Sequence, residues 1–357
     1  MDGRLGVFIV AVTLVQIAER VGLSPATVSL AIRNKSVGKK HLSSKTISKI
    51  HRMAKEMGYR PNGMATSLVS NKSNAIGVLI SSLSFGSEAL LDGIKKELVS
   101  DYNALLCVYN SDGANERSKL DLLMRQRVGG VIAAFSGDPE SISIYRELEE
   151  KYNMPIVLID RAIPGLHLPV VRYDHFASTY QGTKALLSLG HKRIRYASVS
   201  MAKLLESTQL RAEGYIKAMQ EAGFGDEIRV TEEMGYKEWT REERIKLIAS
   251  KILDVWRKDT GVTALFVDND WLAYEILDEC GRQNIRVPDD VSILGIGDYH
   301  FSSLSYVGLS SVVSQQQKFM GILAGKLLMD IMNGIPWDGK PIILPVEVKL
   351  RKTTRVV

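Results

Sequence analysis

Apolar residues in the first sixty positions repeat at the three-to-four-residue spacing of α-helices. The repeat occurs in three short stretches, each preceded by a hydroxyl side chain that can cap a helix: Thr13, Ser24 and Ser43. Gly22 ends the first stretch and Gly58 ends the third. The pattern predicts a three-helix unit whose first two helices form a helix-turn-helix. The inward-facing residues are Leu14, Ile17, Ala18, Val21, Val28, Ala31, Ile32, Ile47, Ile50, Met53 and Ala54.

The second of these helices has an outward face that fits the major groove of DNA. Its first turns would reach base edges, and the basic residues around it would contact phosphates. The outward residues are Pro25, Ala26, Thr27, Ser29, Leu30 and Arg33, and the surrounding basic residues are Arg33, Lys35, Lys39, Lys40, Lys45 and Lys49. Because helical pairs of this kind also occur in proteins that bind no DNA, the pattern alone predicts a structure rather than a function.

The distribution of charge supports a DNA-binding role for this region. The 357 residues carry a net charge of +6, but residues 1–72 alone hold 12 lysines and arginines against 3 acidic residues. The remaining residues therefore sum to −3. A basic first fifth on a mildly acidic body is typical of a nucleic-acid-binding head attached to a sensor or catalytic domain.

Composition places the chain among globular proteins of two or three domains, with 45% hydrophobic and 24% charged residues. Two distant cysteines, Cys107 and Cys280, exclude a disulfide scaffold and a cysteine zinc site, and they predict a cytoplasmic protein. No apolar run approaches the roughly 18 residues that cross a bilayer. Residues 1–11 are weakly similar to a signal peptide, and we interpret them as an unstructured leader or a misplaced start.

Two sequence runs carry a resemblance to a known family. The run TLVQIAERVGLSPATVSLAIRNK, followed by LSSKTISKIHRMAKEMGYRPNGMATSL, resembles the DNA-binding head and hinge of the LacI/GalR family of bacterial transcription repressors. The resemblance implies a helix-turn-helix domain over residues 12–60 and a hinge over residues 61–73. In that family the hinge becomes helical when two subunits sit on the operator. Leu68 matches the leucine that wedges into a central base step and kinks the DNA.

The resemblance implies a set of DNA-contacting residues, with one departure. Leu30 stands where many relatives carry an arginine that pairs with guanine, so this position offers only apolar contact, for example to a thymine methyl group. The expected DNA-binding residues are Thr13, Ser24, Pro25, Ala26, Thr27, Ser29, Leu30, Arg33, Asn34, Lys45, Asn62, Ala65 and Leu68.

From Ala75 onward short apolar runs alternate with amphipathic stretches, which predicts parallel sheets covered by helices on both faces. The predicted strands are Ile76–Ile80, Leu105–Tyr109, Gly130–Phe135, Ile156–Asp160, Ile194–Ser198, Ala264–Val267 and Val291–Ile296. The predicted helices are Ala89–Val99, Arg117–Arg125, Thr179–Leu189, Arg211–Ala222, Glu242–Trp256 and Trp271–Asn284. Two such sheets imply two lobes with a ligand cleft at the strand carboxyl ends.

The same family resemblance extends through residues 74–357 in segments such as PIVLIDR, VTALFVDND and RVPDDVSILG. It implies an α/β effector-binding and dimerisation domain of two doubly wound parallel sheets, similar to periplasmic sugar-binding proteins. Such a chain crosses between its lobes three times, here expected near Arg172, Tyr299 and Pro336.

The effector residues that the resemblance implies are polar groups suited to a polyol or sugar. They are Ser81, Phe85, Asp160, Arg161, Arg211, Asn269, Asp270 and Asp298. Several positions depart from the family pattern: Gly297 stands where a ligand-contacting carboxylate is usual, and His175 replaces a common asparagine. Ser178 and Glu275 stand where glycines are common. These departures predict a remodelled pocket.

No motif in the chain indicates catalysis, a metal or a cofactor. The segment from Gly321 to Lys326 is similar to a phosphate loop but has the wrong spacing, and it is predicted to be the small-residue face of a packed helix. Gly295 and Gly297 lack the third glycine of a dinucleotide site, and the six histidines show no metal-ligand spacing.

We therefore expect no enzyme, but a homodimeric transcriptional regulator, a repressor whose affinity for a near-palindromic operator is controlled by a small carbohydrate-like effector. A solute-binding protein or a sugar-modifying enzyme on the same two-lobed fold is the alternative.

Overall fold

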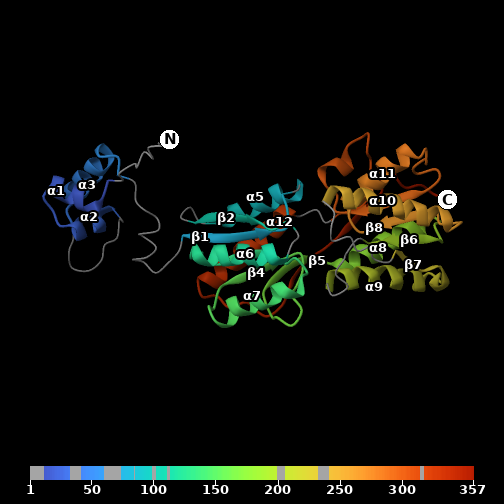
Figure 1. The fold of residues 1–357 in the computed structure, drawn as a ribbon, viewed down its shortest axis with the longest axis horizontal. Coiled ribbons are helices and arrows are strands. Elements are labelled where there is room, and N and C mark those ends of the chain that lie inside the picture. The colour runs from blue at the N-terminus through green and yellow to red at the C-terminus, as the bar shows by residue number, and fades with distance from the viewer. Residues whose placement is uncertain are drawn as a thin grey trace, which may run out of the picture. The chain divides into compact units, whose positions relative to one another are not determined.

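The computed structural model describes residues 12–32, 42–59, 74–83, 85–98, 102–110, 113–198, 206–231, 241–313 and 317–357. Contacts divide the chain into two units, Met1–Ser73 and Asn74–Val357 (Figure 1). The predicted leader at 1–11 and hinge at 61–73 lie outside the described residues.

The first unit is a three-helix bundle. Helices α1 (Leu14–Val21), α2 (Pro25–Ile32) and α3 (Ser44–Glu56) bury a small core of apolar side chains between them. The buried members of that core are Ile17, Ala18, Val21, Val28, Ala31, Ile50 and Ala54. Gly22 has a φ of 72°, a left-handed conformation that glycine adopts without strain, and this sharp turn separates α1 from α2. The packing is that of a helix-turn-helix with a supporting third helix.

The second unit contains two six-stranded sheets. The first has the order β11-β5-β4-β3-β1-β2 and is parallel throughout. Its strands are β1 (Ala75–Ile80), β2 (Asn103–Val108), β3 (Val131–Ala134), β4 (Ile156–Ile159), β5 (Val170–Tyr173) and β11 (Ile342–Leu344). We call this sheet and its helices the first lobe.

Helices cover both faces of this sheet, as parallel strands require (Figure 1). Helices α5 (Phe85–Glu97) and α12 (Gln317–Met332) pack on one face, and α6 (Gly113–Arg125) and α7 (Pro139–Glu150) pack on the other. The backbones of α5 and α12 approach so closely that a Cβ at Gly93 or Gly321 would collide with the carbonyl group of the facing helix. This close approach confirms the packed-helix prediction for the segment from Gly321 to Lys326.

The second sheet has the order β12-β10-β9-β8-β6-β7, with only β12 antiparallel to its neighbour. Its strands are β6 (Ile194–Ala197), β7 (Arg229–Thr231), β8 (Ala264–Val267), β9 (Ser292–Ile296), β10 (Ser310–Val313) and β12 (Glu347–Lys349). Helices α8 (His175–Ser188) and α9 (Glu206–Glu221) pack on one face, and α10 (Arg241–Lys258) and α11 (Asp270–Arg282) pack on the other. Two short 3₁₀ helices, η1 (Gly225–Glu227) and η2 (His300–Ser303), complete this second lobe.

The chain passes between the lobes three times, and two of the expected positions are wrong. The first crossing follows β5, close to Arg172 as predicted. The second lies between β10 and α12 rather than near Tyr299, because β10 extends the second sheet after β9. The third lies between β11 and β12 rather than near Pro336, because β11 pairs with β5 of the first sheet.

Candidate DNA-binding and effector sites

The start of the helix-turn-helix is fixed by reciprocal capping. Thr13 donates its backbone N–H to Oε1 of Gln16 at 2.8 Å, and its hydroxyl accepts from the Gln16 backbone N–H at 3.3 Å. Ser24 caps α2 by accepting from the Thr27 backbone N–H at 3.2 Å, and the hydroxyl groups of Ser24 and Thr27 lie 2.8 Å apart. The hydroxyl groups of Thr13, Ser24 and Thr27 therefore take part in fixing the starts of the two helices.

The outer face of α2 is available for contact with DNA. Pro25 and Ala26 are exposed, and Thr27, Ser29 and Leu30 are partly exposed, whereas Val28 and Ala31 face the core. Lys45 is exposed at the start of α3, but the Nζ atom of Lys49 donates to the Val21 carbonyl at 3.1 Å. The predicted contacts Arg33, Asn34, Asn62, Ala65 and Leu68 lie outside the described residues.

A polar cluster in the second unit joins the two lobes at the first crossing. Asp160 follows β4 in a left-handed conformation, with a φ of 70°. Its backbone carbonyl lies 2.7 Å from Nε2 of His175, the first residue of α8. Its carboxylate is paired with Arg161, whose Nη2 lies 3.1 Å from Oδ2. We call Asp160, Arg161, Arg172, His175, Glu206 and Arg211 the crossing cluster.

Two arginines extend the crossing cluster. Arg172 of β5 in the first lobe pairs with Glu206 of α9 in the second, with 3.4 Å between Nη2 and Oε1. Arg211, also in α9, donates from Nη1 to the backbone carbonyl of Asp268 at 3.2 Å. The Thr179 hydroxyl holds the Arg211 backbone by donating to its carbonyl at 2.6 Å. The structure thus brings together three of the predicted effector residues, Asp160, Arg161 and Arg211.

The electrostatics of the crossing cluster keep its acid ionised and its histidine neutral. Burial alone would raise the pKa of Asp160, but the charges of Arg161, His175 and Arg211 lower it to about 2. Burial, reinforced by the charge of Arg211, lowers the pKa of His175 to about 4. At neutral pH the cluster therefore offers a carboxylate, guanidinium groups and an uncharged imidazole.

Asn269 lies at the carboxyl end of β8 and caps α11. Its Oδ1 accepts from the Leu272 backbone N–H at 2.9 Å, and its Nδ2 donates to Oδ1 of Asp268 at 2.7 Å. Asp268 also accepts from the Ser198 hydroxyl at 3.1 Å, and its carbonyl holds Arg211. The amide of Asn269 is thus connected to Arg211 through Asp268.

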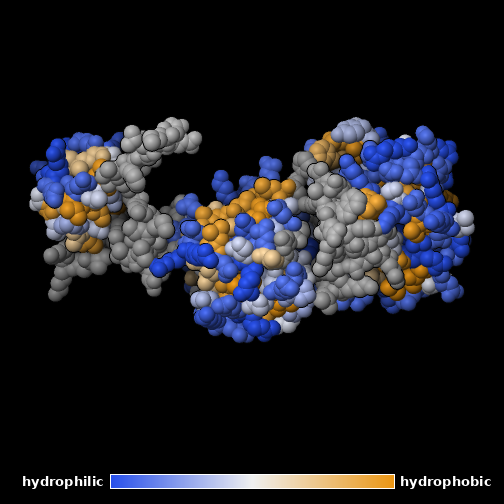
Figure 2. Space-filling view, in the orientation of Figure 1, coloured by the Kyte–Doolittle hydropathy of each residue, from blue (hydrophilic) through white to orange (hydrophobic). Residues whose placement is uncertain are grey.

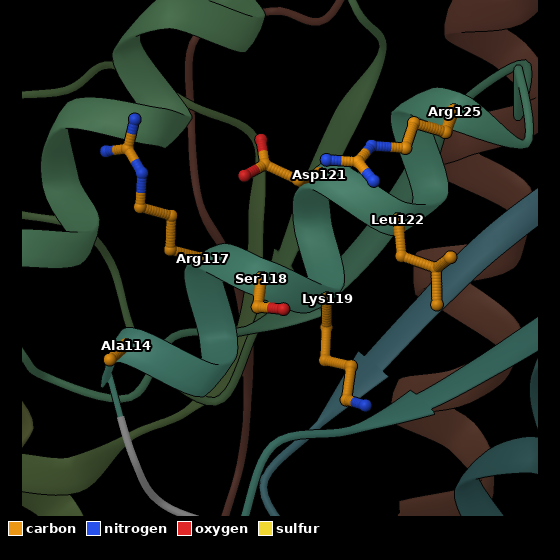
Figure 3. Close-up of a pocket in the computed structure, with 7 residues that line it drawn as sticks. All are labelled: Ala114, Arg117, Ser118, Lys119, Asp121, Leu122 and Arg125. Carbon is orange, nitrogen blue, oxygen red and sulfur yellow. The ribbon is translucent and has the colours of Figure 1, made fainter.

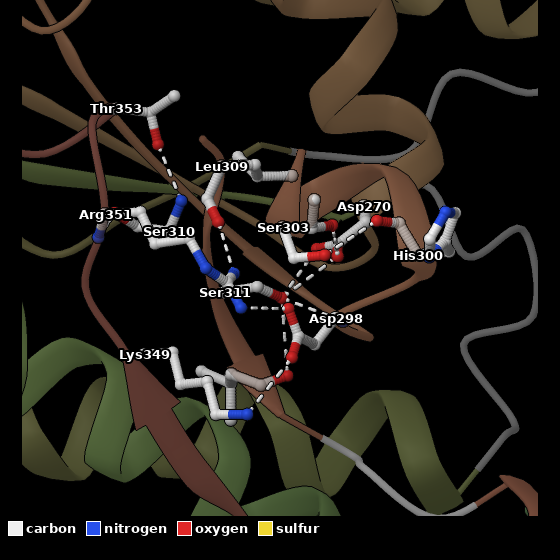
Figure 4. A network of polar contacts seen from close by, with 12 residues as sticks. Asp270, Asp298, His300, Ser303, Leu309, Ser310, Ser311, Lys349, Arg351 and Thr353 are labelled. Carbon is white, nitrogen blue, oxygen red and sulfur yellow. Dashed lines mark hydrogen bonds and ion pairs between the residues drawn. The ribbon is translucent and has the colours of Figure 1, made fainter. Parts of the chain in front are cut away.

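Asp270 is not placed to contact an effector, which corrects the sequence prediction. It is completely buried, and its carboxyl group accepts from Ser302 Oγ at 2.6 Å and from Ser311 Oγ at 2.8 Å (Figure 4). Burial raises the pKa of Asp270 to about 6, and Gly295 leaves no room between this carboxyl group and β9. Its function is to hold η2 and β10 against α11.

Asp298 is also occupied within the second lobe rather than free for a ligand. Its Oδ1 lies 2.6 Å from Nη2 of Arg351, and its Oδ2 lies 3.5 Å from Nζ of Lys349 (Figure 4). Its backbone N–H donates to the Ser311 hydroxyl at 3.0 Å. Asp298 therefore anchors β12 and the carboxyl-terminal segment, and this second effector assignment is corrected as well.

The two remaining predicted effector residues lie at the carboxyl end of β1. Ser81 is partly exposed and its side chain is hydrogen-bonded to that of Tyr109. Phe85 begins α5, but its side chain lies outside the described residues.

A surface depression over α6 is a poor candidate for an effector site. All its lining residues come from that one helix, and most of them are exposed (Figure 3). Arg117, one of them, donates to the Ser143 hydroxyl at 2.9 Å. Ligand sites of small molecules instead bury most of the ligand between several elements.

A basic helix-turn-helix unit and a two-lobed α/β unit together define the class of ligand-responsive DNA-binding regulators. Family profiles agree: residues 13–62 match "Bacterial regulatory proteins, lacI family" and residues 183–354 match "Periplasmic binding protein-like domain". The first unit thus contains a DNA-binding domain of the LacI family, and the second contains a periplasmic-binding-protein-like domain.

Relatives and solved structures match over nearly the whole chain. The HTH-type transcriptional repressor PurR of Pasteurella multocida is 26% identical, with 96% of this chain and 98% of the relative covered. Catabolite control protein A of Priestia megaterium is 27% identical, with 96% and 99% covered. A lac repressor dimer solved with operator and an anti-inducer has the same fold, with a TM-score of 0.76 at 24% identity and coverage of 97% and 99%.

Three members of the crossing cluster, Arg172, His175 and Glu206, were not among the effector residues predicted from the sequence. The sequence showed His175 only as a replacement for asparagine, directly after the Asp174 N-cap of α8. The sequence signal that could have identified His175 is its position: it is a polar residue at the start of the helix that follows the crossing strand β5.

Proposed function

We propose that this protein is a cytoplasmic, homodimeric repressor without catalytic activity, whose affinity for operator DNA is controlled by a small hydroxylated effector. The observation that carries the proposal is the crossing cluster. Its hydrogen bond between His175 and Asp160, and its ion pair between Arg172 and Glu206, both bridge the lobes. A ligand that binds there changes contacts to both lobes and can shift their relative angle.

The head supplies the DNA-reading part of the proposal. Two copies of α2 would enter successive major grooves of a near-palindromic operator, because a two-fold dimer presents two equivalent heads. Lysines and arginines outside α2 would supply most of the salt-dependent affinity. Leu68 is proposed to wedge into a central base step from the minor groove, so Leu68→Ala should weaken operator binding and reduce bending without changing the fold.

Dimerisation has a suitable surface on the first lobe. Large apolar side chains are exposed there, and Figure 2 shows hydrophobic residues gathered on the visible face of this lobe. Exposed apolar residues of the first lobe include Leu83, Leu106, Leu122 and Phe319. Contiguous apolar surface of this kind commonly marks a protein interface.

No helix among the described residues is long and apolar enough to cross a membrane.

Carbohydrates are the first effectors to test. Solved proteins with this fold contain cellobiose, ribose and D-xylulofuranose. The test is a thermal-shift screen of the full chain against sugars, nucleosides and purines, followed by DNA retardation with each hit. A compound that raises the melting temperature and changes DNA retention supports the proposal. Intact DNA binding without any such compound contradicts control by a small effector.

A further inference from the structure

Three nitrogen atoms of the crossing cluster are buried and lack hydrogen-bond partners among the described residues. They are Nε of Arg172, Nδ1 of His175 and Nε of Arg211. A buried polar atom without a partner costs about 1–3 kcal/mol, so proteins seldom leave several together unless something else satisfies them. These three belong to a single group, because the charges of Arg172 and Arg211 both act on His175.

The free atom of His175 is a hydrogen-bond acceptor. Its other ring nitrogen, Nε2, lies 2.7 Å from the Asp160 carbonyl oxygen, and a carbonyl oxygen can only accept. Nε2 must therefore carry the proton. Because burial and the charge of Arg211 lower the pKa of His175 to about 4, the ring is neutral at physiological pH and Nδ1 keeps its lone pair.

The free atoms of the two arginines are donors. Arg211 already uses Nη1 on the Asp268 carbonyl, and Arg172 uses Nη2 on Glu206. Their Nε–H groups cannot satisfy a partner that also needs to donate. The cluster thus presents one acceptor beside donors, on side chains from both lobes.

This combination discriminates between ligand groups. A hydroxyl group donates one hydrogen bond and accepts others, so a single hydroxyl can satisfy both His175 and an arginine. A carboxylate accepts from the guanidinium groups but has no proton to donate to Nδ1. The site therefore favours a neutral hydroxyl over an acceptor-only anion.

We propose that His175 is an effector-contacting, specificity-determining residue that accepts a hydrogen bond from a ligand hydroxyl, whose oxygen in turn accepts from Nε–H of Arg211. The proposal rests on the effector-binding function proposed above. It names the chemical group that the effector places between the lobes, and it adds a residue that sequence comparison alone did not mark. The adjacent Nε–H of Arg172 is available to a second oxygen of the same ligand.

The first test uses the full-length protein and hydroxyl-bearing probes, D-ribose and cellobiose, with acetate at neutral pH as the acceptor-only probe. Binding is measured by thermal shift and calorimetry for the wild-type protein, His175→Phe and His175→Asn. Phenylalanine keeps a flat ring but removes the acceptor, and asparagine restores an acceptor oxygen. His300→Phe, at an exposed histidine of η2, is the matched control.

We expect at least one sugar probe to bind the wild type, with affinity falling about tenfold or more in His175→Phe and returning in part in His175→Asn. The control should bind like the wild type. Equal sugar affinity in His175→Phe overturns the proposal. Stabilisation by acetate alone, or a lack of stabilisation by both sugars at high millimolar concentration, overturns it as well. If a sugar binds through His175 but leaves DNA retention unchanged, the hydroxyl assignment stands and the repressor mechanism fails.

A second measurement reads the hydrogen bond to His175 directly in the wild type. In ¹⁵N-histidine spectra of the wild type, the free Nδ1 of His175 should resonate as an unprotonated nitrogen and move upfield by several ppm when the sugar probe donates to it. The signal is assigned by its absence in His175→Asn. An unchanged signal at saturating probe overturns the proposal.

Discussion

Tyr299 of the second lobe lies directly against Gly86 of the first. A Cβ built at Gly86 would stand 3.3 Å from Cε1 of the Tyr299 ring. The opposite edge of the ring covers Gly297, where a Cβ would stand 3.0 Å from Cε2. Because Gly297 has a φ of 137°, a conformation that favours glycine, the residue that replaces the usual carboxylate also makes room for this ring.

Removing the ring should therefore loosen the contact between the lobes. We expect Tyr299→Ala to lower the free energy of unfolding by about 2 kcal/mol, less than for a fully buried aromatic residue because Tyr299 is partly exposed. Chemical denaturation measures the change. Tyr306→Ala, at a side chain that is 78% exposed, should alter stability by less than about 0.5 kcal/mol. Equal losses in both variants would show that the contact has no stabilising effect.

Arg211→Ala should abolish the response to effector while DNA binding remains. The guanidinium group holds the Asp268 carbonyl and lies near Asp160 and His175, so its loss removes the donors proposed for the ligand. DNA retardation with and without a sugar hit measures the response. Arg282→Ala, which breaks a surface pair with Asp278 and Glu279, is the matched control. A normal response in Arg211→Ala would place the effector elsewhere.

Lys45 is expected to contact a phosphate group. Its side chain is exposed in the first turn of α3, and the positive end of a helix attracts an anion such as a phosphate group. Lys45→Ala should weaken binding to all DNA sequences alike and reduce the slope of log K against log salt by about one per subunit. Lys258→Ala, at an exposed lysine of α10, should leave the slope unchanged. A sequence-selective loss would instead indicate base contact.

Glu116 is completely buried, and we expect the fold to tolerate its replacement by glutamine, the corresponding amide. Oε1 of Glu116 accepts from the Tyr145 hydroxyl at 2.7 Å and from the Ser136 backbone N–H at 3.2 Å, and an amide oxygen can accept both bonds. Its Oε2 accepts from the Ser136 hydroxyl, which can rotate to accept from the amide N–H of a glutamine instead. Burial raises the pKa of Glu116 above its usual 4.5, so the ionised form is disfavoured in the fold.

The raised pKa of Glu116 makes the free energy of unfolding depend on pH. A raised carboxyl pKa means that the wild type loses stability as pH rises through and above 4.5, whereas Glu116→Gln does not. The stability of the variant relative to the wild type should therefore increase as the pH rises above 4.5. Denaturation across this range measures it, and Glu116→Ala, which cannot accept the bonds, should be less stable at every pH. A flat difference for Glu116→Gln would contradict the raised pKa.

His175 should make the second unit sensitive to mild acid. Its folded pKa of about 4 lies below the usual 6.5, so the unfolded chain binds more protons between these values. The contribution of His175 to stability is complete above pH 6.5 and should fall by about 3 kcal/mol as pH drops toward 4, whereas the raised pKa of Asp270 acts in the opposite direction over part of this range. His175→Gln should remove the His175 contribution, so the stability of the variant relative to the wild type should rise as pH drops from 6.5 toward 4, while His191 and Asp270 titrate in both proteins. An unchanged slope would show that His175 is not the titrating group.

The sequence predicted the head well because its signals are local. Thr13, Ser24 and Gly22 fix caps and a turn within a few residues, and the apolar stripes of the helices face one another. In the second unit the predicted helices began late, for example at Thr179 and Arg211 instead of His175 and Glu206. Polar first turns are set by capping and by crossing contacts, which the apolar pattern does not show.

The site was harder to predict because it depends on distant partners. Asn269 and Asp270 are adjacent in sequence at the end of β8, but their side chains have different partners. The carboxyl group of Asp270 is taken up by Ser302 and Ser311, more than thirty residues away. Asn269 is instead connected to Arg211 through Asp268. Strands β11 and β12, three residues each, exist only through pairing with β5 and β10. No short window of sequence contains that information.

The three crossings of the second unit have a consequence for how such proteins diversify. Neither lobe is continuous in sequence, so exchanging one lobe with a relative would require several simultaneous junctions, each inside a packed region. The head is joined to the rest of the chain at only one boundary, between Ser73 and Asn74. A single recombination event there can combine one head with another sensor, whereas a change confined to one lobe of the sensor has to arise by substitution within the second unit.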